Sequence, residues 1–123
     1  MSSCKINVSF GELYDKYSIL QIKKEKISNE EKLMYINKEI EYLKPFISDT
    51  ILDNTTFKEL KQINETLWDI DDNIIIKEKN NEFDSEFISL ARLVYKTNDK
   101  RHLAKNKIDN ICNSEIKEIK SYA

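Results

Sequence analysis

The sequence predicts an all-α protein, an antiparallel helical bundle of four main helices. Three observations carry this prediction. Only one glycine and one proline occur in 123 residues, whereas a β-rich fold would need turn residues about every ten positions. Apolar residues recur in alternating steps of three and four, the spacing of one helix face. Serine, threonine and asparagine stand where these segments begin, as helix caps do.

The first helix is expected from about Phe10 to Ile27, after an extended lead-in over residues 1–8. Ser9 followed by Glu12 forms a capping box at its start. Ser28-Asn29 is then a turn, and Asn29 caps the second helix.

The second helix has a continuous apolar seam. Its members are Leu33, Ile36, Ile40, Leu43 and Ile47. Pro45 is expected to end or kink this helix, because proline lacks the N–H and disfavours helix at the residue before it. Residues 48–55 then form the main loop.

Thr56 and Glu59 make a second capping box, and the third helix is expected to run from there to about Lys79. Its apolar seam consists of Leu60, Ile63, Leu67, Ile70 and Ile74. The next stripe, at the edge of the seam, consists of Asn64, Trp68, Asp71, Ile75 and Glu78. An amide, an indole and two acids on one stripe form either a structural hydrogen-bond network or a binding site.

Asn80-Asn81 breaks the chain, and a fourth helix follows from about Asp84 to Tyr95. Its inward-facing residues are expected to be Phe83, Phe87, Leu90 and Val94. Asn98 then caps a fifth helix from about residue 99 to residue 112, or the two helices are continuous, since the break at residues 97–98 is weak. Residues 114–123 form a tail with one helical turn. Connections this short favour antiparallel neighbours, and residues 1–123 are expected to form a single domain.

Composition excludes several classes of function. The net charge of −2 creates no overall field that attracts nucleic acid or an anionic membrane. Neither a membrane-length apolar run nor a signal peptide is present, so we expect a cytoplasmic protein. Cys4 and Cys112 lack zinc-site spacing, and a glycine-rich phosphate loop cannot be built from one glycine.

Charge is distributed unevenly along the chain. Residues 65–86 contain eight acids and two lysines, while residues 92–107 contain six bases and one acid. Either these two segments lie together and offset each other, or the second presents a basic face to an anion.

Two polar groups could carry chemistry. Glu12 and Asp15 lie one turn apart, and with Asp72 and its neighbours they could hold a magnesium ion. The alternative is that Glu12 pairs with Lys16 on its own helix. The sequence predicts no cofactor other than this magnesium ion.

The second group surrounds the predicted break near residue 97. Its members are Arg92, Tyr95, Asn98, Asp99 and Arg101. Two arginines near the start of a helix could bind phosphate or carboxylate. The alternative, which we favour, pairs Arg92 with Asp71 or Asp72 and lets Tyr95 close the network.

Three motifs resemble those of a family of small, mostly bacterial, all-helical proteins of unknown function. GELxDKxxILxIK begins at Gly11, NxxLWxIxD at Asn64 and LARxVYxxNDxR at Leu90. The resemblance spans nearly the whole chain and carries over to Glu12, Asp15, Lys16, Asn64, Trp68, Asp72, Glu78, Arg92, Tyr95, Asn98, Asp99 and Arg101. Where the family often has glutamate and arginine, this chain has Asp71 and Ile75, and the second departure weakens any site that needs a cation there.

The sequence therefore supports two functions. The first is a module that binds a protein partner or itself through exposed apolar residues such as Ile51, Leu52, Ile75, Ile76 and the tail. The second is a phosphate- or phospho-sugar-binding protein, or a metal-dependent enzyme, with its site between the first, third and fourth helices. We predict the first function, the interaction module, and the sequence does not decide whether the protein is an enzyme. Nucleic acid ranks last as a partner and no membrane contact is expected.

Overall fold

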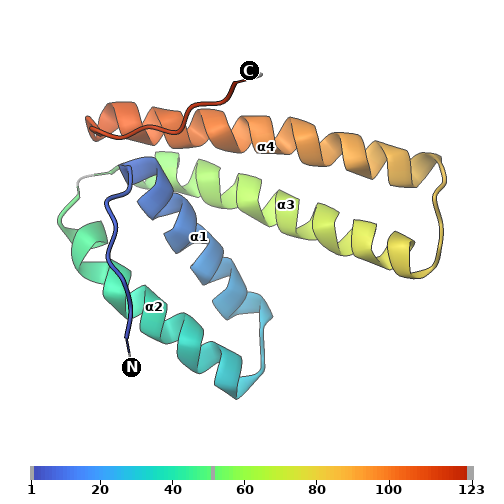
Figure 1. Cartoon of the computed structure of the whole chain (residues 1–123), viewed down its shortest axis with the longest axis horizontal. Coiled ribbons are helices and arrows are strands. Elements are labelled where there is room, and N and C mark those ends of the chain that lie inside the picture. The colour runs from blue at the N-terminus through green and yellow to red at the C-terminus, as the bar shows by residue number, and fades with distance from the viewer. Residues whose placement is uncertain (1, 51, 122–123) are drawn as a thin grey trace.

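A computed structural model of the chain describes residues 2–50 and 52–121. It contains four helices: α1 (Phe10–Lys26), α2 (Glu30–Ser48), α3 (Asn54–Lys79) and α4 (Ser85–Ile111). α1 and α2 form one hairpin and α3 and α4 a longer one (Figure 1). The predicted all-α, bundle-like fold is confirmed. The described part of the chain contains no helix long and apolar enough to cross a membrane.

The core lies where the two hairpins meet. Tyr14, Leu60 and Ile108 bring together α1, α3 and α4 in one buried cluster. A second cluster of Leu20, Ile36 and Ile40 joins α1 to α2. The seam predicted for α2 supplies Ile36 and Ile40 to the second cluster, and the seam predicted for α3 supplies Leu60 to the first. The distal half of the α3–α4 hairpin extends beyond α1 and α2 (Figure 1), and among the described helices only α1 packs directly on the two helices of this hairpin.

Of the helix caps predicted at Ser9, Asn29 and Thr56, the first two are confirmed. The Ser9 hydroxyl accepts the N–H of Glu12, and the Asn29 side chain accepts that of Lys32. The predicted cap at Thr56 is wrong, because Asp53 caps α3 and Thr56 lies inside its first turn. The Thr56 N–H and hydroxyl both donate to the Asp53 carboxylate, which begins the helix three residues earlier than predicted.

Pro45 does not end α2, which continues to Ser48. The hydroxyl of Ser48 donates to the carbonyl of Lys44, and that of Thr50 to the carbonyl of Phe46. These bonds satisfy carbonyl groups near the end of the helix, while Ile47 packs against the core.

α4 is one continuous helix, which is the second of the two alternatives for residues 97–98. Thr97 is buried, so packing holds the helix through a point where capping residues could have broken it. The inward position predicted for Phe83 is wrong, since 57% of it is exposed. Phe87, Leu90 and Val94 are half-buried. The helical turn predicted in the tail is absent from residues 114–121.

The tip of the long hairpin is held by one lysine. Lys77 Nζ lies 3.2 Å from Glu82, 2.8 Å from Asp84 and 3.0 Å from Glu86. Asn81, at the predicted break, has a φ of 54°, a left-handed conformation that asparagine tolerates better than most residues. Charge pairing and one turn residue therefore fix the tip where apolar burial is slight.

Candidate functional site

A buried carboxylate is the centre of the polar contacts between α1, α3 and α4. Asp15 is 2% exposed. The guanidinium of Arg101 bonds it with two nitrogens, Nε to Oδ1 at 2.8 Å and Nη2 to Oδ2. Asn64 Nδ2 donates to Asp15 Oδ1 at 3.0 Å and to the Ser18 hydroxyl at 2.8 Å. Asp15, the strongest candidate for binding a ligand, is therefore held by side chains of the protein itself.

The predicted partners of these acids differ from those observed. Glu12 bonds Lys105 at 2.8 Å, while Lys16 pairs with Glu39 on α2 at 2.7 Å. The expected pairing of Glu12 with Lys16 is therefore wrong. Helical spacing allowed that pair, but packing brings α4 and α2 closer to the two side chains.

The acids proposed to share a metal with Glu12 and Asp15 do not join them. Asp71, Asp72 and Glu78 lie exposed on α3, beyond the part of the helix that α1 covers. Nowhere in residues 2–50 and 52–121 do three or more His, Cys, Asp or Glu side chains form a group that could hold a metal ion.

The second predicted group is divided between two places. Arg101 belongs to the buried polar cluster, and Asp99 lies 4.0 Å from Lys120 of the tail. Arg92 and Tyr95 line a shallow groove on the outer face of α4, a space of about 500 Å³ that Phe87 and Lys96 also border. Asn98 is half-buried, between the two places along α4.

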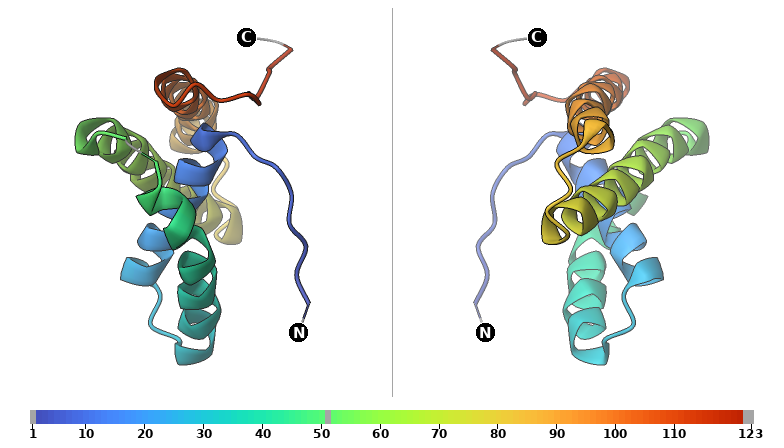
Figure 2. Two further views of the ribbon diagram at one scale, coloured as in Figure 1. Left: turned by 90° about the vertical axis from the view of Figure 1, so that its left-hand side faces the viewer. Right: turned by 90° about the vertical axis from the view of Figure 1, so that its right-hand side faces the viewer.

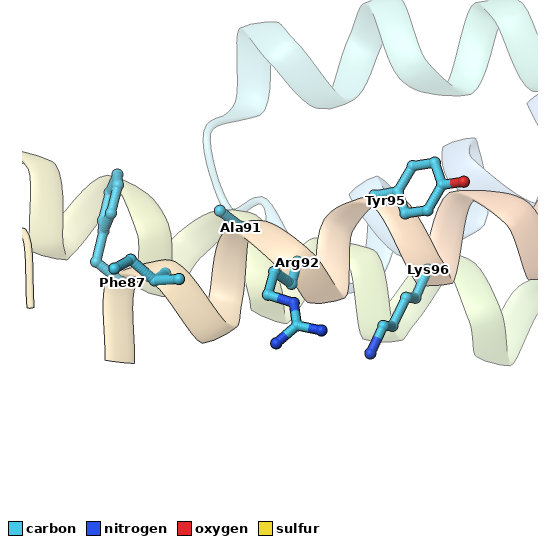
Figure 3. A pocket seen from close by; sticks show the side chains of 6 residues that line it. Phe87, Ala91, Arg92, Tyr95 and Lys96 are labelled. Atoms are coloured by element: carbon cyan, nitrogen blue, oxygen red, sulfur yellow. The ribbon is translucent and has the colours of Figure 1, made fainter. Parts of the chain in front are cut away.

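The favoured pairing of Arg92 with Asp71 or Asp72 is wrong, since Arg92 makes no ion pair with any described residue. Figure 3 shows Phe87, Ala91 and Tyr95 along one edge of the groove and Arg92 and Lys96 along the other. Trp68, a member of the polar stripe predicted on the third helix, is half-buried on α3 and does not line the groove.

Sequence reasoning named Arg101 but missed Lys105 and Asp109, the other residues of α4 that complete the polar cluster. Arg101, Lys105 and Asp109 follow one another at intervals of four, so they share one face of the helix. Asp109 accepts the N–H of Gly11 at 2.6 Å, which ties the start of α1 to α4. The signal was available in this spacing, but the basic residues of this segment were considered only as a group and not by their place on one helix face.

The C-terminal tail is fastened to the same cluster. Lys105 Nζ bonds Glu118 at 2.7 Å, and His102 Nδ1 lies 3.2 Å from the same carboxylate. Burial alone would lower the pKa of Lys105, but its hydrogen bonds with Glu118 and Glu12 outweigh burial and raise it. The hydrogen bond from Lys105 lowers the pKa of Glu118 below its usual 4.5.

The depressed pKa of Glu118 predicts a pH dependence. A carboxylate whose pKa is lower when folded stabilises the fold above its unfolded pKa, and this contribution disappears as the pH falls through the folded pKa. We expect the unfolding midpoint of the wild type to drop more steeply than that of Glu118→Gln below about pH 4.5. Thermal unfolding at a series of pH values measures this, and parallel curves for the two proteins would contradict the tail contact.

The fold and this cluster define a class: a small all-α protein in which a buried ion-pair network joins three helices, with a long helical hairpin projecting beyond it. The chain belongs to a family of unknown function, DUF6165, whose model matches residues 4–123. No curated protein and no solved structure matches the chain.

Proposed function

We propose that this protein is a helical protein-interaction module that binds its partner through the distal part of the α3–α4 hairpin. The supporting observation is a contrast between two regions of one molecule. The polar cluster around Asp15 is occupied by Arg101, Asn64 and other groups of the chain. The hairpin beyond it leaves several large apolar side chains open to water. They are Ile75, Ile76, Phe83, Ile88, Leu93 and Tyr95.

Exposed apolar side chains that gather on one element are typical of interaction surfaces, whereas isolated ones are ordinary. The predicted surface included Ile75 and Ile76, both exposed by half or more. Of the other predicted members, Leu52 is half-buried against the core, Ile51 lies outside the described residues, and Ile116 and Ile119 of the tail are exposed.

The alternative functions have less support. A metal ion at Glu12 and Asp15 would have to displace Lys105 and Arg101 from these acids, and a phosphate at Arg101 would have to displace Asp15 from the guanidinium. Removing one partner of a buried charge pair is expensive. We therefore favour binding over catalysis, and we assign the protein to the cytoplasm, where the two free thiols of Cys4 and Cys112 would remain reduced.

α2 offers a competing surface, because Tyr42 and Phe46 are also exposed. The experiment therefore compares two positions. A photo-reactive amino acid is placed at Ile76 on the hairpin or at Tyr42 on α2, and the cells that produce the protein are irradiated. We expect a cross-linked product of defined mass from position 76 and little or none from position 42.

A product from position 42 alone would assign the interaction to α2 and overturn the proposed hairpin surface. Absence of a product from both positions would overturn the proposal that the protein is an interaction module. The mass of the product also identifies the kind of partner, because a cross-linked pair of copies has twice the 14.6 kDa of one chain.

A further inference from the structure

The long hairpin has two broad sides, and α1 packs on only one of them. Asn64 of α3 and Arg101 and Lys105 of α4 bond to α1, which identifies the covered side. By helical geometry the opposite side, which we call the open face, carries residues rotated by about 80° or more around the helix axis from these. Its members in the distal half are Asp69, Asn73, Ile76, Ser89, Leu93, Lys96 and Lys100.

The open face has an apolar centre and a hollow between its helices. Ile76 of α3 is 56% exposed and Leu93 of α4 is 44% exposed. A shallow groove of about 440 Å³ runs between the two helices, lined by Ile76 and Asn73 on one side and Ser89 and Leu90 on the other. Figure 2 shows α1 and α2 extending away from the hairpin, and Figure 1 shows the distal half of the hairpin projecting beyond both.

Charge on this face is segregated by helix. α3 contributes acids, Asp69 with Asp72 at its edge, and α4 contributes bases, Lys96 and Lys100 with Arg92 at its edge. No ion pair within the described residues engages any of these five side chains. Each copy of the chain therefore presents a row of unpaired acids beside a row of unpaired bases.

The two rows lie at matching heights along the hairpin. The ion pairs Lys77–Glu86 near the tip and Lys107–Glu59 near the base fix how α3 is aligned against α4. In this alignment Asp69 lies level with Lys96, and Asp72 lies level with Arg92. A half-turn about an axis parallel to the helices would therefore place each acid row over the base row of a second copy.

We propose that the open face binds a second copy of this chain, about a two-fold axis parallel to the α3–α4 hairpin, to form a four-helix bundle. Asp69 and Asp72 of each copy then pair with Lys96 and Arg92 of the other, around a centre formed by Ile76 and Leu93. Such an interface is isologous, so both sets of ion pairs form at once. The bundle would bury side chains that a two-helix hairpin leaves in water.

The alternative arrangements fit less well. A two-fold axis across the helices would place α3 on α3 and bring acid over acid, which is unfavourable. An axis along the hairpin on its other side would bring the α1 helices of the two copies into the same space. The inference rests on the proposed function, because it names the partner of the same hairpin.

The test is a charge-reversal experiment on purified protein. One variant carries Asp69→Lys and Asp72→Lys, and the other carries Arg92→Glu and Lys96→Glu. Each alone places like charges across the two-fold axis, so we expect its dimer to be about a hundredfold weaker than that of the wild type. Mixing the two variants restores acid over base at every pair, so we expect a heterodimer to form.

Sedimentation velocity over a range of concentrations measures the wild type, each variant and the mixture, and circular dichroism checks that each variant is folded. Glu78→Lys on the covered side is the matched control and is expected to dimerise like the wild type. A wild-type chain that stays monomeric, or a mixture that fails to associate, would overturn the second-copy inference. A monomeric wild type that still cross-links another protein from position 76 would leave the proposed function standing.

Discussion

Replacing Arg101 with methionine is expected to destabilise the protein by about 3 kcal/mol. The change keeps the aliphatic stem but removes both hydrogen bonds from the guanidinium to Asp15. Asp15, which is 2% exposed in this structure, would then be a carboxylate whose remaining side-chain hydrogen bond comes from Asn64. Losing one partner of a buried ion pair costs about 3–5 kcal/mol, and the lower end applies because 30% of the Arg101 side chain is exposed. Urea unfolding followed by circular dichroism measures the loss.

A second variant separates the loss of stability caused by the unpaired buried charge from the loss caused by poorer packing. Asp15→Asn combined with Arg101→Met removes both charges, so we expect it to be more stable than Arg101→Met alone. If the double variant loses the sum of the two single losses, the pair does not interact and the polar cluster is misassigned.

Replacing Gly11 with alanine is expected to cost about 2–4 kcal/mol. A Cβ at this position would lie 2.5 Å from the carbonyl oxygen of Lys105 and 2.9 Å from Asp109 Oδ1. The backbone oxygen cannot move aside as a flexible side chain can, so α1 and α4 must separate. Separation weakens the 2.6 Å bond from the Gly11 N–H to Asp109.

The control for this prediction is Lys24→Ala, an exposed position on the same helix, which should change stability by no more than about 0.5 kcal/mol. The comparison uses the same urea titration. Equal stability of Gly11→Ala and the wild type would mean that the two helices are not in close contact at this point.

The helices could be predicted from sequence because their causes are local. The caps at Ser9 and Asn29 and the seam through Leu60 and Ile70 lie within a few residues of the structure that they produce. The inward position predicted for Phe83 failed because tertiary packing decides it, whereas the error at the start of the third helix is local. The start of α3 at Asn54 depends on Asp53 competing successfully with Thr56 as the cap.

The sequence predicts several residues that belong to the site but not which of them pair with each other. Asp15, Asn64 and Arg101 were all named as candidates, and the structure brings these three together. Which acid meets which base depends on the angle between α1 and α4, and a pattern within one helix contains no information about that angle. Arg92 was expected to pair with Asp71 or Asp72 of α3, but it lies in a groove lined by residues of α4 alone.

Hydrogen–deuterium exchange of the purified protein at low and high concentration is the most direct test of the central claim, that the distal α3–α4 hairpin binds a second copy of the chain. Association protects amides near the contact and leaves distant ones unchanged. We predict that raising the concentration slows exchange in residues 69–79 and 85–100 and leaves α1 and α2 unchanged. Protection gained on α2, or on none of the helices, would contradict it.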